Sequence, residues 1–136
     1  MQIYTIRLKE GDELRSSLMN FAKENNLTAA SILTCVGSIN QANIRMAGAA
    51  PDRQDIREYS DPYEIVSLVG TFDGENCHIH IALSDTNGQV VGGHLKSVIV
   101  HTTAEIVVLN DETKRYVREM DKETGFIELS VKEKNV

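Results

Sequence analysis

Three histidines between positions 78 and 94 are the residues of this chain best suited to chemistry. Residues 77–83 alternate between apolar and polar side chains, and strand side chains point to opposite faces with a period of two. His78 and His80 should therefore share one strand face. A turn later, a pair of glycines allows close backbone approach and is followed by His94. Three histidines with an open fourth position are typical of catalytic zinc, so the pattern predicts a divalent metal, zinc, at His78, His80 and His94.

A second interpretation of these histidines stays open. An isolated histidine on a polar strand face is usually just solvated, so each of the three could lack a ligand. His101 follows the apolar residues 98–100, where a buried or edge histidine is expected, and we place it outside the metal site.

Two carboxylates interrupt otherwise apolar segments. Glu64 opens residues 64–69, and Glu105 lies within residues 103–108. A charge in an apolar strand is costly unless it has a partner. Glu64 and Glu105 are therefore candidate catalytic residues, acting as a general base, a metal ligand or an orienting partner of a histidine. The alternative is a solvated strand face for each.

The elements that must position these residues are one helix and several strands. Residues 2–8 alternate as a strand, and Asp12 can cap a helix whose apolar stripe includes Leu14 and Leu18 and which ends near Asn25. Residues rich in β-branched side chains then predict strands at 31–36, 42–46, 64–72, 77–83, 97–109 and 126–131. Residues 47–61 should form an exposed loop and residues 111–122 a solvated excursion. This predicts one α+β domain over residues 1–136, with a mainly antiparallel sheet and one main helix packed on it.

Composition limits the classes of partner. The 136 residues carry 14 Lys and Arg against 20 Asp and Glu, a net charge of −6, which disfavours a phosphate backbone. Cys35 and Cys77 do not form a secreted disulfide framework. No segment has the roughly 18 apolar residues of a membrane span, and the N-terminus lacks a signal-peptide pattern. We expect a cytoplasmic protein without a membrane partner.

Motifs typical of one known family occur along nearly the whole chain, at residues 37–39, 63–71, 78–80, 88–95, 103–107 and 124–129. Through these motifs the chain resembles the PPC domain (plants and prokaryotes conserved). The resemblance implies an α/β fold with a central antiparallel sheet, a homotrimer, and a metal bound by His78, His80 and His94 as in prokaryotic members that keep these histidines.

In plants the domain follows an AT-hook in nuclear DNA-binding proteins. This sequence has no Arg-Gly-Arg-Pro AT-hook and is acidic. We therefore expect a stand-alone homotrimer whose metal site binds or activates a small ligand or water. The alternative is a DNA-binding or protein-interaction module without catalysis, with a basic patch at Arg45, Arg53 and Arg57. The sequence leaves open whether the protein is an enzyme.

Overall fold

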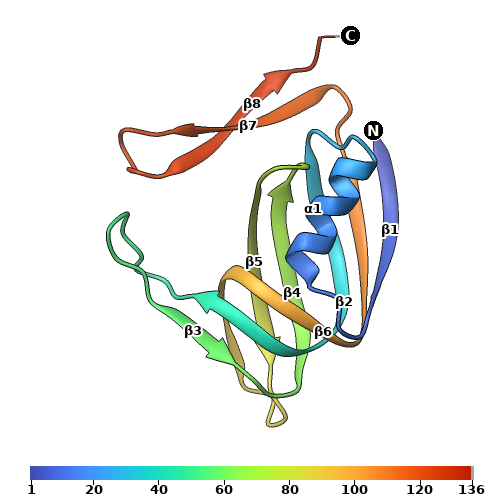
Figure 1. Cartoon of the computed structure of the whole chain (residues 1–136), viewed down its shortest axis with the longest axis vertical. Coiled ribbons are helices and arrows are strands. Elements are labelled where there is room, and N and C mark those ends of the chain that lie inside the picture. The colour runs from blue at the N-terminus through green and yellow to red at the C-terminus, as the bar shows by residue number, and fades with distance from the viewer. Residues whose placement is uncertain (136) are drawn as a thin grey trace.

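A computed structural model describes residues 1–135 as a curved antiparallel sheet with one helix and a separate hairpin (Figure 1). In chain order the elements are β1 (Gln2–Lys9), α1 (Leu14–Glu24), β2 (Ala30–Arg45), β3 (Ile56–Tyr59), β4 (Tyr63–Phe72), β5 (Cys77–Ser84), β6 (Val90–Asn110), β7 (Lys114–Met120) and β8 (Ile127–Glu133).

The main sheet closes on itself through its two longest strands. Its order is β1-β6-β5-β4-β2-β3, and β6 also pairs with β2, so that β2, β4, β5 and β6 form a ring. Every pairing is antiparallel. Several register shifts along β2 and β6 let these strands bend around the ring, as bulges do. The predicted antiparallel sheet with one helix is confirmed, although the fold is dominated by its barrel-like sheet and the α+β class holds only coarsely.

The interior of the ring is filled by aliphatic side chains. Ile79, Ile81 and Leu83 of β5 are buried at alternate positions, and Leu14 and Leu18 of α1 are fully buried in the same core. Burial of this apolar surface is the main force that holds the sheet and the helix together. In residues 1–135, α1 is too short and too polar to cross a membrane, and no other helix is present.

The helix starts one residue later than the sequence predicts. Glu13, not Asp12, is the N-cap, and its carboxylate accepts hydrogen bonds from the backbone N–H groups of Arg15 and Ser16, both at 2.9 Å. The same carboxylate accepts from Val98 N at 3.0 Å, which ties α1 to β6. Asp12 instead accepts from Lys9 N and closes the turn after β1.

Two short strands lie in segments expected to be irregular. β3 falls within residues 47–61 and β7 within residues 111–122. Both are edge or hairpin strands without an apolar alternation, and their partners β2 and β8 specify them through backbone pairing. The segments predicted at 31–36 and 42–46 belong to one strand, β2, and the segment predicted at 97–109 is the second half of β6.

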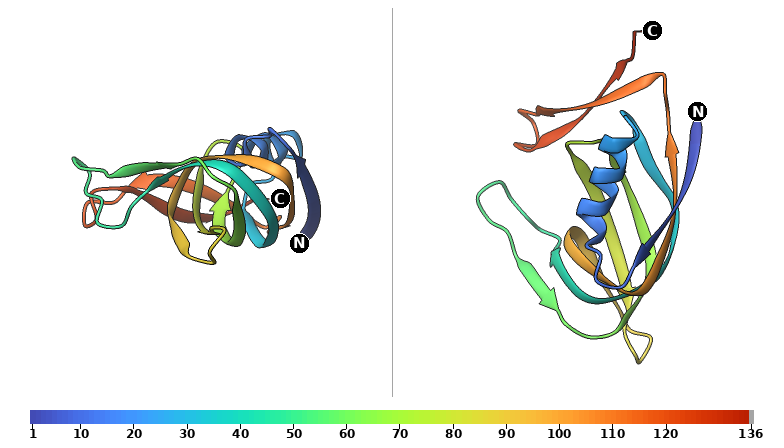
Figure 2. Two further views of the ribbon diagram at one scale, coloured as in Figure 1. Left: turned by 90° about the horizontal axis from the view of Figure 1, so that it is seen from below. Right: turned by 45° about the vertical axis from the view of Figure 1, so that its right-hand side comes forward.

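Two arms leave the ring on the same side (Figure 2). One is the β7–β8 hairpin, and the other is the chain between β2 and β3. Their tips approach each other, since a Cβ atom added to Gly125 would lie 3.1 Å from Cγ of Pro51. The hairpin base is held by a backbone bond from Tyr116 N to Thr28 O at 2.8 Å. The two arms therefore form walls over one part of the sheet surface.

Candidate metal centre

The register of four strands places the three histidines together on the outer face of the ring. His80 of β5 is the direct partner of His94 of β6, and His94 is in turn the partner of Arg45 of β2. On its other side His80 faces Val69 of β4, so these four residues form a row across four strands. His78 lies two positions before His80 on β5 and therefore on the same face, as the alternation predicts.

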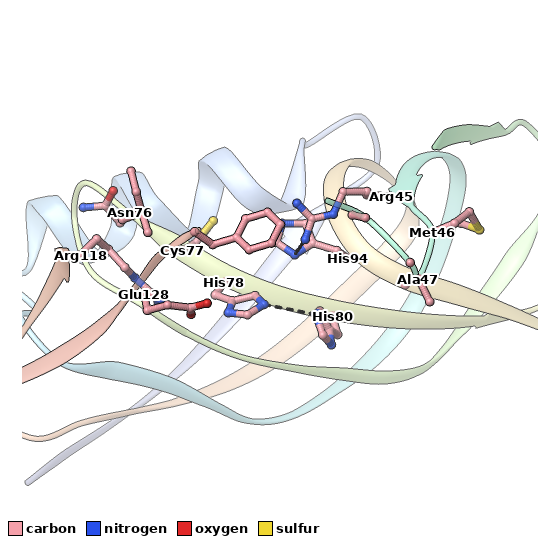
Figure 3. Close-up of a pocket in the computed structure, with 15 residues that line it drawn as sticks. Arg45, Met46, Ala47, Asn76, Cys77, His78, His80, His94, Arg118 and Glu128 are labelled. Atoms are coloured by element: carbon pink, nitrogen blue, oxygen red, sulfur yellow. Dashed lines mark hydrogen bonds between the residues drawn. The ribbon is translucent and has the colours of Figure 1, made fainter. Parts of the chain in front are cut away.

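The three imidazole rings are close enough to share one ion. One ligand nitrogen from each ring lies within 4.8 Å of the other two. The Nε2 atoms of His78 and His80 are 3.2 Å apart (Figure 3). Two ligands of a tetrahedral zinc ion with Zn–N bonds of about 2.0–2.1 Å are separated by roughly 3.3 Å, so this nitrogen pair has the spacing of a zinc site. The donor set thus fits a divalent metal of the kind that imidazole ligands prefer.

Two glycines bring β6 close enough for His94 to join the pair. A Cβ atom on Gly92 would lie 2.4 Å from the carbonyl oxygen of Ile81, and one on Gly93 would lie 2.5 Å from that of Arg45. Any side chain here would force β6 away from β5 and β2. The glycine pair therefore provides the close backbone approach predicted from the sequence.

The histidines open into a cavity of about 630 Å³. Its floor is the outer face of β5 and β6, and its walls are the two arms. The end of β2 contributes Arg45, the first arm contributes Met46, and the hairpin contributes Arg118, Phe126 and Glu128. Figure 3 shows the carboxylate of Glu128 close to the ring of His78. Arg118 Nη2 donates to Thr71 Oγ1 at 3.1 Å, and Thr71 is the cross-strand partner of His78.

Burial and positive neighbours keep two of the rings neutral. Desolvation, followed by the charge of Arg45, lowers the pKa of His94 to about 4. Desolvation, followed by the neighbouring His80 and Arg118, also lowers the pKa of His78, against an opposing effect of Glu128. Neutral imidazole is the form that binds a metal, so this environment favours the metal-binding form.

The metal-free protein should lose stability as the pH falls from about 6.5 toward 4. The folded state resists protonation of His94, whose pKa is about 4, whereas the unfolded chain takes up that proton near pH 6.5. Urea unfolding at steps between pH 7 and pH 4.5 measures the effect. His94→Gln should show a smaller loss over the same interval. An unchanged slope in that variant would contradict the lowered pKa.

The other predicted site residues lie elsewhere. Glu64 lines a separate hollow with Ser38 and His101, and Glu105 faces Arg7 and Val36 in the sheet. Neither lines the histidine cavity. Glu105 instead acts on Cys35, whose thiol pKa is raised to about 11 by burial and then by this carboxylate.

His101 stands apart from the three-histidine group, as expected. Its Nδ1 lies 3.3 Å from a carboxylate oxygen of Glu10, a residue of the turn that follows β1. In residues 1–135, the group close enough to hold one ion contains His78, His80 and His94 alone.

Two of the three arginines considered as a DNA-binding patch have neighbours within the chain. Arg45 faces the histidine cavity and contacts His94 Nδ1 at 3.3 Å. Arg57 of β3 pairs with Asp55 at 2.9 Å. Arg45 therefore faces the cavity and Arg57 is paired locally, while Arg53 is exposed.

Sequence reasoning missed the cavity residues of the hairpin. Glu128 is half-buried, while its neighbours Ile127 and Leu129 are exposed. Because this acidic residue is less exposed than the apolar residues beside it, the polar face of β8 is turned toward the rest of the molecule. The sequence shows the alternation of polar and apolar residues in this strand. It does not show which of the two faces is turned toward the cavity.

Comparison with known proteins gives a family for the chain. The model of the Plants and Prokaryotes Conserved (PCC) domain matches residues 1–111. The bifunctional protein GlmU of Synechococcus sp. strain JA-3-3Ab is 35% identical over 132 residues, covering 96% of this chain and 21% of that protein. The AT-hook motif nuclear-localized protein 14 of Arabidopsis thaliana is 27% identical over 106 residues, covering 74% of this chain and 24% of that protein. The chain thus spans about a fifth to a quarter of the length of these relatives.

Two solved structures share nearly the whole chain. A hypothetical protein from Salmonella cholerae-suis has a TM-score of 0.93 and 31% identity, covering 98% of this chain and 95% of its own. The metal-containing protein AF0104 from Archaeoglobus fulgidus has a TM-score of 0.84 and 29% identity, covering 96% and 94%. With the fold, the antiparallel ring and the matched residues in agreement, this chain belongs to the Plants and Prokaryotes Conserved domain family.

Proposed function

We propose that this protein is a homotrimeric, cytoplasmic metal-binding domain that holds one divalent ion, zinc, on His78, His80 and His94 and binds or activates a small ligand or water there. The observation that carries the proposal is the convergence of three imidazole nitrogens within 4.8 Å of one another at the floor of a cavity. The related Archaeoglobus protein is described as metal-containing, which adds support. The free Cys35 and Cys77 suit a reducing compartment.

The chain's own residues divide the work of such a site. The three histidines supply neutral nitrogen ligands, and zinc held by three protein ligands acts as a Lewis acid and lowers the pKa of a bound water to about 7. Glu128 is placed to orient His78 or to accept a proton from a ligand in the cavity. Glu128 takes the role that the sequence suggested for Glu64 or Glu105, because it is a carboxylate that lines the cavity. Arg45 and Arg118 add positive charge beside the ion.

Metal analysis of protein purified without an affinity tag tests this function. We expect about one zinc per chain, removed by chelation and restored by titration. The metal-free protein should stay folded, because the aliphatic core holds the sheet without the ion. No metal in the purified protein and no zinc uptake in calorimetry would contradict the proposal. Unfolding on chelation would indicate a structural metal instead of a ligand-binding one.

Two separate apolar surfaces support assembly into a ring of three. The first, the sheet patch, consists of Leu33 and Val36 on β2 with Val66 and Val69 on β4, each 54–60% exposed. The register between Ser31↔Thr71 and Gly37↔Ile65, continued through the intervening residues, sets these side chains opposite each other. Exposed patches of this kind mark interfaces.

The second surface, the hairpin stripe, consists of the exposed apolar residues on one face of β7–β8. Cross-strand pairing puts Met120 beside Ile127, and Leu129 and Val131 follow on the same face. A cyclic trimer uses a head-to-tail interface, in which one surface of each protomer meets a different surface of the next. One sheet patch and one hairpin stripe per chain provide such a pair.

Duplex DNA should bind weakly, which separates the metal-binding function from the DNA-binding alternative. With a net charge of −6 and Arg45 committed to the cavity, few phosphates can be neutralised. The Kd for a labelled duplex should be no tighter than about 10⁻⁴–10⁻⁶ M at physiological salt. Fluorescence anisotropy at several salt concentrations measures it. Nanomolar, sequence-selective binding would favour the alternative, which the nuclear plant relative suggests.

A further inference from the structure

Two guanidinium groups share the cavity with the histidines, and they come from opposite walls. Arg45 extends from the end of β2 and places Nη2 3.3 Å from His94 Nδ1. Arg118 extends from β7 and contacts Thr71, the partner of His78. In Figure 3 the two side chains lie on either side of the histidines. A ligand that reaches the histidines therefore passes between two positive charges.

Within the described residues 1–135, neither guanidinium has an anionic partner. Among residues 1–135, no carboxylate lies within 4.0 Å of a nitrogen of Arg45 or Arg118. Glu128 is the one acidic residue in the cavity lining, so the lining is net positive even without a metal. The whole chain carries a charge of −6, which makes this concentration of positive charge unusual for the molecule. Unpaired guanidinium forks in a cavity are suited to an anion that arrives with the ligand.

The remaining lining is mainly apolar, with Asn76 as the polar exception. Met46 and Ala49 come from the first arm, and Phe126 comes from the hairpin. A hydrated inorganic anion gains nothing from such side chains. A carboxylate with a small hydrocarbon body fills both the charged and the apolar part, as ligands of concave sites do.

We propose that the cavity binds a small organic carboxylate beside the metal. Arg45 holds the carboxylate next to the three histidines, and Arg118 of the hairpin supplies the second positive charge. Met46 and Phe126 contact the hydrocarbon part. This inference rests on the proposed metal site and adds the chemical class of its ligand.

Calorimetric titration with matched probes tests the ligand class. Isobutyrate carries a carboxylate, isobutyramide has the same shape without the charge, and inorganic phosphate carries charge without a hydrocarbon part. The zinc-loaded protein should bind isobutyrate at least tenfold more tightly than either of the other two. In cobalt-loaded protein, isobutyrate should also change the visible absorption of the ion, because the anion lies beside it.

Arginine variants identify the groups responsible. Arg45→Gln and Arg118→Gln should each weaken isobutyrate binding by about ten- to a hundredfold, the usual range for a hydrogen bond to a charged group. Isobutyramide binding should not change. Arg57→Gln is the matched control, since Arg57 lies on β3, pairs with Asp55 and does not line the cavity. Zinc content is measured for every variant, so that a lost metal is not mistaken for a lost anion contact.

The outcomes separate this inference from the proposed function. Normal zinc uptake with equal binding of isobutyrate and isobutyramide would overturn the carboxylate inference and leave the metal site standing. Tighter binding of phosphate than of isobutyrate would also overturn it. Failure of zinc uptake would overturn the metal site. In that case isobutyrate binding is measured with metal-free protein. The carboxylate inference holds if Arg45→Gln weakens this binding and is wrong if it does not.

Discussion

Replacing His80 with alanine should lower the zinc affinity of this protein by more than about a hundredfold. His80 is the central residue of the cluster, since it faces His94 across the strand pair and its Nε2 lies 3.2 Å from that of His78. Loss of an outer partner of a metal ligand already costs 10- to 100-fold, and loss of a ligand should cost more. His78→Ala and His94→Ala should behave in the same way. Competition with a chromophoric chelator measures the affinities.

His101→Ala is the matched control for these variants. His101 is a histidine on the same strand as His94, but it contacts Glu10 and lies outside the three-histidine group. Its removal should leave zinc affinity within about twofold of the wild type. Circular dichroism should show all four variants folded, because none of the four side chains belongs to the buried core. Equal zinc binding by the wild type and His80→Ala would refute the site.

A single glutamate in either apolar surface should convert the assembly to monomers. Val66→Glu places a charge in the sheet patch, and Leu129→Glu places one in the hairpin stripe. A buried unpaired carboxylate costs several kcal/mol, enough to dissociate a trimer of ordinary affinity. Light scattering should give about three times the 15.1 kDa chain mass for the wild type and about one chain mass for each variant.

Val90→Glu provides the control for assembly. Val90 is 58% exposed, comparable to Val66, but it is the first residue of β6 and belongs to neither apolar surface. That variant should keep the trimer mass. A wild-type protein that is monomeric at micromolar concentration would contradict the assembly proposal, and trimers in both glutamate variants would show that other surfaces form the contact.

The strand that carries His78 and His80 could be predicted from the sequence because its pattern of polar and apolar residues lies within seven consecutive positions, 77–83. Alternation with a period of two sets both histidines on one face whatever the rest of the chain does. The same reasoning identifies the inward face of β5 and the amphipathic helix. It could not identify the N-cap, because Glu13 is selected by a contact with Val98 that the local sequence does not contain.

The residues around the histidines depend on pairings between distant segments. Arg45 meets His94 only because β2 and β6 pair along most of their length. Glu128 reaches the cavity because a hairpin folds back over the sheet, and Glu64 and Glu105 stay outside because their strands carry them to other parts of the surface. Register over such separations is a property of the whole fold, and no local pattern encodes it.

The hairpin has a consequence for how related proteins can diverge. The three histidines and Arg45 lie within residues 1–111, the part that the family model matches, while Arg118, Phe126 and Glu128 lie beyond it. The two strands of the hairpin pair with each other and not with the ring, which they contact through Tyr116 and Arg118. The other positions of the hairpin can therefore change with little effect on the ring. Related proteins could therefore differ in these roughly twenty residues and so in the ligand they select, while they keep the three histidines proposed to hold the ion.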